Sequence, residues 1–293
     1  MDYFQYKRKE VRDLAWVIRS AFLICDERHS YQDDFSLHHY RLMENFLISL
    51  DKNPSDLYSF LGQLRSPFLG HYFEKLVMFW IKHDPEIELL ANNIQIKEEG
   101  RTKGEIDLIF DYQGSQEHWE LAVKFYMGTG SGEHLNQWIG PNPVDRFDLK
   151  LGKILNQQLE LSKTEAAAGK LSTLGVDIQE RKHFIKGYLY YPLGSDIKPL
   201  IHANEFHNRS WWIYEDQLDL LDQKYLVRKE KRHWLSLDIF SQEDLVPVSK
   251  IPQLLRSRKR LKPQLFSIVE KDGKHYRELS SGFIAMRNWP ERI

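Results

Sequence analysis

Two carboxylates and a lysine occupy two short apolar segments between residues 104 and 125. The first segment, GEIDLIF, carries Asp107, and the second, WELAVKF, carries Glu120 and Lys124. Successive side chains of a β-strand point to opposite faces, so Glu120, Ala122 and Lys124 share one face of the second segment. This pattern predicts acidic and basic groups gathered on one face of otherwise apolar strands.

A Gln-Gly-Ser stretch separates the two segments and predicts a β-hairpin with a two-residue turn at Gly114–Ser115. Directly opposed residues of an antiparallel pair lie on the same face. An even-length loop places odd positions of the first strand opposite even positions of the second. We therefore expect Asp107 to face Glu120, Ala122 or Lys124.

Two carboxylates and an ammonium on apolar strands are costly to bury unless they are paired or bind an ion. Mg²⁺ takes oxygen ligands, with one or two carboxylates completed by water and substrate phosphate, and a neighbouring lysine can orient or deprotonate the attacking water. The chemistry that these residues predict is metal-assisted phosphodiester hydrolysis. The alternative is a structural Asp/Glu/Lys cluster on a half-exposed sheet, because surface ion pairs are common.

The two segments resemble the core of the PD-(D/E)XK, or restriction-endonuclease-like, nuclease superfamily. Its pattern is an acidic residue on a helix, an Asp on one strand and (D/E)XK on the next strand. The matching positions are Glu74 in GHYFEKLVMFW, then Asp107, then Glu120 with Lys124. The superfamily separates its Glu and Lys by two positions, whereas here they are four apart, which moves one group along the strand but keeps it on the same face.

The resemblance extends to the segments GPNPVDRFDLKLGKILNQQLELS and LAWVIRSAFLI, which are similar to one uncharacterised family of this superfamily, catalogued as domain of unknown function eighteen-fifty-three. It implies an α/β fold with a restriction-endonuclease-like core, a mixed central sheet flanked by helices. It also implies that Asp107 and Glu120 ligate Mg²⁺ or Mn²⁺ and that Lys124 positions water. Glu74 would act through a metal-bound water or hold Lys124.

The segment 71–82, HYFEKLVMFWIK, has apolar residues at helical spacing and is apolar almost all round. Such a helix is buried. Glu74 is therefore expected to be an interior or cleft carboxylate. The alternative to a site role is a paired core glutamate that holds Lys124.

A second helix is predicted over residues 145–161. At 100° per residue, one side of it gathers Arg146, Lys150, Lys153 and Gln157. A row of this kind can contact successive phosphates of DNA or RNA, or it can be a solvated helix face. Basic runs at 229–232 and 256–262 leave the same two interpretations open.

Composition limits the other classes of protein. The chain has 293 residues, 42% of them hydrophobic, and a net charge of −1, so affinity for nucleic acid would come from local patches. The longest apolar run, at residues 76–81, is too short to span a bilayer. With no apolar secretory segment at the start and one cysteine, Cys25, we expect a cytoplasmic protein. The histidines, His38 and His39 among them, show no HExxH spacing and are interpreted as ordinary polar groups.

The order of the elements predicts a single α/β domain over residues 1–293. It consists of a helical N-terminal region at 1–69, a core at 70–215 that the resemblance implies is nuclease-like, and a C-terminal extension at 216–293. Further strands are expected at 87–96, 184–191 and 211–214. A second functional interpretation remains open: a nucleic-acid or protein binding module that keeps the fold without efficient catalysis, for which the wider Glu–Lys spacing is the main support.

Overall fold

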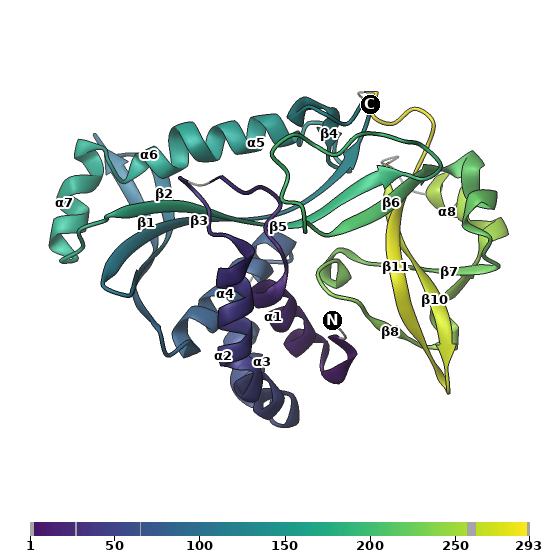
Figure 1. Cartoon of the computed structure of the whole chain (residues 1–293), viewed down its shortest axis with the longest axis horizontal. Coiled ribbons are helices and arrows are strands. Elements are labelled where there is room, and N and C mark those ends of the chain that lie inside the picture. The colour runs from purple at the N-terminus through teal and green to yellow at the C-terminus, as the bar shows by residue number, and fades with distance from the viewer. Residues whose placement is uncertain (1–2, 27, 65, 257–261, 292–293) are drawn as a thin grey trace.

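The computed structural model describes residues 3–26, 28–64, 66–256 and 262–291. It is an α/β structure built on one large mixed sheet that is flanked by helices (Figure 1). The α-helices that the structure describes are α1 (Lys9–Arg19), α2 (Asp33–Lys52), α3 (Ser55–Gly62), α4 (Leu69–His83), α5 (Phe147–Lys153), α6 (Leu159–Leu161), α7 (Glu165–Thr173) and α8 (Ile251–Arg256).

The strands of the sheet are β1 (Ile87–Glu98), β2 (Arg101–Tyr112), β3 (Ser115–Gly128), β4 (Trp138–Ile139), β5 (Glu180–Pro192), β6 (Arg209–Tyr214), β7 (Tyr225–Arg228), β8 (Ile239–Phe240), β9 (Leu245–Pro247), β10 (Gln264–Asp272) and β11 (His275–Ala285). Their spatial order is β1-β2-β3-β5-β6-β11-β10-β7-β9, with β4 beside β3 and β8 beside β11. The pairs β3–β5, β5–β6 and β6–β11 are parallel and the other pairs are antiparallel. The C-terminal strands thus continue the sheet that the central strands begin.

The hairpin predicted around the Gln-Gly-Ser stretch is present as β2 and β3. Tyr112 pairs with Ser115, so the turn is Gln113–Gly114, one residue earlier than expected. Both turn residues have positive φ, 55° and 82°, which suits the mirror-image turns that tight hairpins prefer. The loop has an even number of residues, as expected, so odd positions of β2 still lie opposite even positions of β3.

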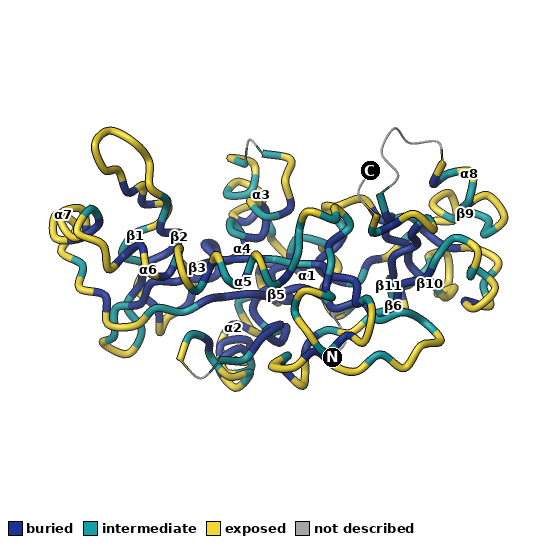
Figure 2. Tube along the Cα trace, turned by 90° about the horizontal axis from the view of Figure 1, so that it is seen from above, coloured by how far each residue is buried: buried dark blue, intermediate teal, exposed yellow. Residues whose placement is uncertain are grey.

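Helices cover both faces of the sheet. Helices α1–α4 pack on one face and α5–α7 on the other, as Figure 1 shows. The buried residues follow the sheet along its length from β1 to β10 (Figure 2). The predicted helix at 71–82 is α4, and its buried face includes Phe73, Trp80 and Ile81.

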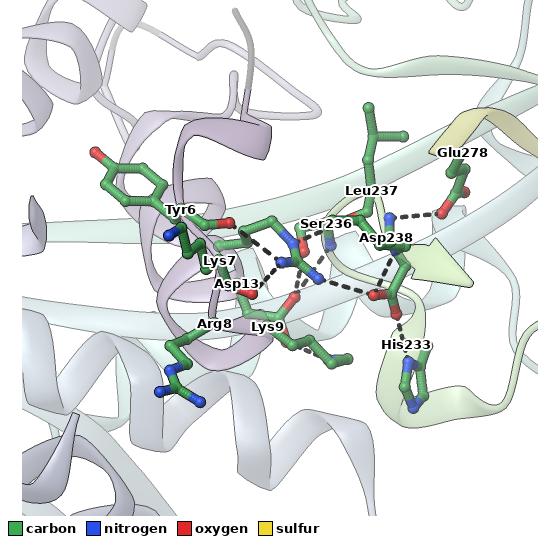
Figure 3. A network of polar contacts seen from close by, with 12 residues as sticks. Tyr6, Lys7, Arg8, Lys9, Asp13, His233, Ser236, Leu237, Asp238 and Glu278 are labelled. Atoms are coloured by element: carbon green, nitrogen blue, oxygen red, sulfur yellow. Dashed lines mark hydrogen bonds and ion pairs between the residues drawn. The ribbon is translucent and has the colours of Figure 1, made fainter. Parts of the chain in front are cut away.

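The N-terminal helix α1 is joined to the C-terminal part of the chain by a buried polar network (Figure 3). Arg12 forms an ion pair with Asp238 at 2.8 Å and also donates to the carbonyl of Leu237. Asp13 accepts hydrogen bonds from the backbone and hydroxyl of Ser236. The helical N-terminal region is therefore held by contacts that span more than 220 positions of the sequence.

Two segments differ from the sequence-based expectation. The amphipathic pattern from Val11 to Ile24 predicts one helix, but α1 ends at Arg19 and Ile24 forms a bridge with Ala203. The run HWLSLDIF at 233–240 has a strand-like pattern but forms only the short β8, because the backbone of 234–238 is irregular and carries the Asp238 network. Residues 257–261 of the basic run at 256–262 lie outside the described residues.

A candidate active site where β2 and β3 separate

The candidate site lies where the backbone ladder between β2 and β3 stops. Leu108 and Trp119 are the last paired residues, and the next positions in the same register are Asp107 and Glu120. There the Oδ2 atom of Asp107 accepts a hydrogen bond from the backbone N–H of Leu121 at 2.9 Å. A side chain thus replaces the backbone acceptor that a continuing strand would supply, and the edge of β3 opens beyond this point.

Asp107 and Glu120 form a coupled carboxyl pair. Glu120 is fully buried. Burial, together with the charge of Glu120, raises the pKa of Asp107 to about 7. Burial also raises the pKa of Glu120 to about 7, although the charge of Lys150 and a hydrogen bond with Asp107 act in the opposite direction. Near neutral pH the pair is therefore poised to hold a proton or to exchange it for another cation.

Two side chains fix the orientation of Glu120. His118 Nε2 lies 2.8 Å from Oε1 of Glu120, and Gln158 Nε2 donates to Oε2. Burial lowers the pKa of His118 to about 4, so its ring is neutral and donates from one nitrogen only. The other ring nitrogen, Nδ1, lies 3.0 Å from the hydroxyl of Ser162, which accepts a hydrogen bond from Arg181. Both oxygens of Glu120 are thus anchored by protein groups.

The helix that carries Gln158 contains a π-helical turn. The sequence predicts one regular helix over 145–161, but residues Ile154–Gln158 are π-helical, and the N–H of Leu159 bonds the carbonyl of Ile154 five positions back. A π turn adds one residue to the helix. At about 100° per residue, Lys150 and Gln158 would lie about 80° apart on a regular helix, and the extra residue brings them to within about 20°. Gln158 therefore faces the carboxyl pair, whereas Gln157 is exposed.

Lys150, and not Lys124, is the lysine beside the carboxyl pair. Its Nζ donates to Oε1 of Gln158 at 3.1 Å, which connects it through Gln158 to Glu120. Burial lowers the pKa of Lys150, and the charge of Lys124 lowers it further. Lys124 is close enough to influence Lys150, but it donates to both oxygens of Asp145 at 2.9 Å. The expectation that Glu74 holds Lys124 is wrong, because Asp145 takes that position.

Glu74 reaches the same region from α4, on the other face of the sheet. Burial raises the pKa of Glu74, and the negative charge of Asp107 adds to the shift. Glu74, Lys124, Asp145 and Lys150 line a cavity of about 910 Å³ that opens beside β3. Residues in and beside the C-terminal strands β7 and β10 also line it: Arg228, Lys229, Glu230, Lys231, Trp234, Lys262, Pro263, Gln264 and Leu265.

The predicted row Arg146, Lys150, Lys153 and Gln157 is not a single surface. Arg146 precedes α5 and forms a two-point ion pair with Asp148. Lys153 and Gln157 are exposed, and only Lys150 lines the cavity. The π turn accounts for the position of Gln157, because it changes the helical phase after Lys153, whereas Arg146 lies before the first residue of α5. Of the first basic run, Lys229 is buried against Glu278 and Lys231 lines the cavity.

The carboxyl pair suits a hard divalent cation. Two carboxyl groups share a hydrogen bond there, both with raised pKa values, and a cation in place of the shared proton would relieve that arrangement. Within the described residues, the oxygens of Glu74, Asp107 and Glu120 do not gather within 4.8 Å as a three-ligand set. Asp107 and Glu120 would therefore be the two protein ligands, as in many Mg²⁺ sites.

Comparison with known protein families gives one match. The family model described as "Domain of unknown function (DUF1853)" matches residues 12–285. This chain belongs to the DUF1853 family. No curated protein and no solved structure matches it. In the described part of this DUF1853 protein, no helix combines the length and the apolar character needed to cross a bilayer.

Several site residues of the DUF1853 protein were missed or given other roles at the sequence level. Gln158 was missed because periodicity alone does not reveal a π turn. His118 was passed over as an ordinary polar group, although it lies two positions before Glu120 and so shares its face of β3. No periodic pattern in the sequence marks Asp145 as a site residue, because it contacts Lys124 from the loop before α5.

Proposed function

We propose that this DUF1853 protein is a metal-dependent nuclease that hydrolyses phosphodiester bonds in DNA or RNA, with a restriction-endonuclease-like core. The observation that carries the proposal is the buried Asp107–Glu120 pair, with Lys150 beside it, at the edge of a cavity that contains several lysines. Perturbed carboxyl pKa values in a cleft are typical of functional sites.

Asp107 and Glu120 would hold Mg²⁺ or Mn²⁺, which when bound supplies Lewis-acid polarisation of a phosphate and activation of water. His118 and Gln158 fix the Glu120 carboxylate, so the pair is oriented before any ligand binds. Glu74, with its raised pKa, is a candidate to accept or donate a proton at the cavity wall.

Lys150 would stabilise the negative charge that develops on the phosphate, the role that the resemblance gave to Lys124. It is the ammonium group whose charge acts on both carboxyls. Lys124, held by Asp145, would contribute a fixed positive charge to the cavity wall. Across the cavity, Arg228, Lys231 and Lys262 supply cationic groups suited to a nucleic-acid backbone.

A binding module without efficient catalysis is the second candidate. Its support is that both oxygens of Glu120 already accept hydrogen bonds and that Ala122 stands where the superfamily pattern has its lysine. Such a module would bind nucleic acid through the same cationic cavity.

A cleavage assay with labelled single- and double-stranded DNA and RNA separates the two candidates. The nuclease should cleave at least one substrate with Mg²⁺ or Mn²⁺, stop in EDTA, and lose activity in Asp107→Asn. Asp111→Asn is a matched control, because Asp111 lies on the same strand near the turn. Binding that is equal in EDTA, with no cleavage of any substrate, would establish the binding module instead.

A further inference from the structure

A second group of potential metal ligands lies away from the carboxyl pair, where α2, the end of α4 and the start of β1 meet. One ligand atom from each of His38, His39 and Glu86 lies within 4.8 Å of the other two. In the described part of the chain this is the one such group of three or more histidine, cysteine or acidic residues. His38 and Glu86 are partly exposed, so a cation can enter from solvent.

His39 has an unused nitrogen. Its ring is fully buried, and Nδ1 lies 2.7 Å from Oδ2 of Asp84. A carboxylate accepts, so Nδ1 carries a proton, and in the neutral form of the ring Nε2 then presents a lone pair. Nε2 is buried and has no hydrogen-bond partner among the described residues. An unpaired buried acceptor is unfavourable unless something binds it.

Asp84 holds His39 in this state. Oδ2 of Asp84 also accepts from the indole N–H of Trp80 at 2.8 Å, and Oδ1 accepts from the backbone N–H of Glu86 at 3.1 Å. A histidine whose far nitrogen donates to a buried carboxylate is the usual arrangement behind a metal-binding imidazole. The same carboxylate also fixes the backbone of Glu86, one of the other ligand residues.

His38 and Glu86 already lie together. His38 Nε2 is 2.8 Å from Oε2 of Glu86. Around a tetrahedral Zn²⁺ with bonds near 2.0 Å, neighbouring ligand atoms lie about 3.3 Å apart. The proposed site requires these two partly exposed side chains to rotate until the three ligand atoms reach that spacing.

We propose that His38, His39 and Glu86 form a site for Zn²⁺ or a similar borderline divalent transition cation, with Asp84 as the group that orients His39. Two imidazoles and a carboxylate suit Zn²⁺ better than Mg²⁺. Three protein ligands leave a fourth position for water. The cation would join α2 to the start of β1, independently of the proposed nuclease site.

The test is Zn²⁺ binding to the untagged full-length protein, measured by competition with a chromophoric chelator and by the absorption of bound Co²⁺. With excess Mg²⁺ present to occupy the carboxyl pair, wild type should bind one equivalent with a tetrahedral Co²⁺ spectrum and a raised Tm. His38→Ala and Glu86→Gln, both at partly exposed positions, should weaken binding at least about tenfold. His275→Ala, an exposed histidine on β11, is the matched control and should bind as wild type does.

The Asp107→Asn variant distinguishes this site from the carboxyl pair. It should leave the affinity of the His38–His39–Glu86 site for Zn²⁺ unchanged. Absence of Zn²⁺ binding by the folded wild type would overturn the proposal. So would equal affinity in His38→Ala and Glu86→Gln, or loss of binding in Asp107→Asn alone, since each places the cation elsewhere. Circular dichroism of each variant confirms that the fold is retained.

Discussion

Lys124 donates hydrogen bonds to both carboxylate oxygens of Asp145, each at 2.9 Å. The lysine on the strand is therefore held in place by a loop residue, and the hydroxyl of Tyr126 adds a third bond to the same carboxylate. This ion pair leaves Lys150, from the helix across the site, as the ammonium beside Asp107 and Glu120. The separate roles of Lys150 and Lys124 can be tested by substitution.

Lys150→Met should lower kcat by roughly 100-fold, the scale for loss of one charge-stabilising group in a transition state. Lys124→Met should act mainly on KM, and should reduce the salt dependence of binding by about one phosphate contact. Lys153→Met, an exposed position on the same helix, is the control. Steady-state kinetics at several salt concentrations measure all three. A larger loss of kcat in Lys124→Met than in Lys150→Met would show that Lys124, and not Lys150, is the charge-stabilising lysine.

Substitution of Gln158, with the neighbouring Gln157 as a control, tests the side-chain positions that the π turn sets. Gln158→Ala removes a hydrogen bond to the buried Glu120 carboxylate, so it should lower the free energy of unfolding by about 1–3 kcal/mol. Gln157→Ala, on the exposed side, should change it by less than about 0.5 kcal/mol. Urea unfolding measures both values. Equal effects of the two substitutions would show that Gln158 does not support Glu120 in solution.

The carboxyl pair should make stability depend on pH. The folded-state pKa values of Asp107 and Glu120 are raised to about 7, above unfolded values near 4. The stabilising contribution of such groups is present below about pH 4 and is lost as pH rises through about 7. Without metal, the free energy of unfolding should fall by on the order of 2 kcal/mol between pH 5 and pH 8.

Asp107→Asn should flatten that pH dependence, and millimolar Mg²⁺ should restore stability at pH 8 in wild type only. Urea unfolding over this pH range, in EDTA and in Mg²⁺, provides the measurement. The idea fails if wild type and Asp107→Asn show the same pH profile and the same response to Mg²⁺.

The ion pair between Arg12 and Asp238 should be important for stability, because both side chains are buried. Arg12→Met removes the buried guanidinium that pairs with Asp238 and should cost about 3–5 kcal/mol of folding free energy. Arg8→Met, at an exposed position one turn earlier, should have little effect. Thermal and urea unfolding compare the two variants. A small cost for Arg12→Met would mean that His233 and the other partners of Asp238 compensate for the loss.

The local pattern of the sequence predicted the parts of the site that depend on strand alternation and helix periodicity. Alternation predicted that Asp107 shares a face with Glu120, Ala122 and Lys124, and the observed register, with its turn one residue earlier, makes Glu120 the next position opposite Asp107. Helical spacing made α4 a buried helix and brought Glu74 to the cavity.

Periodicity could not predict what depends on departures from regular structure or on distant contacts. The π turn reversed the roles of Gln157 and Gln158, and the loop residue Asp145 captured Lys124. The cavity wall formed by Arg228 and Lys231 depends on the C-terminal strands joining the central sheet, which no local pattern reveals. The His38–His39–Glu86 group likewise brings together two segments that are 47 positions apart, His39 and Glu86.

The parallel pairing of β6 with β11 has a consequence for synthesis of the protein on the ribosome. About 60 residues separate Tyr214 at the end of β6 from His275 at the start of β11. At ordinary translation speeds, β11 is therefore synthesised roughly 3–12 s after β6. During that interval the edge of β6, with Trp211, Trp212 and Ile213, is unpaired and open to other chains. A nascent chain arrested before residue 275 should therefore be retained by chaperones or aggregate, while release of the full chain permits folding.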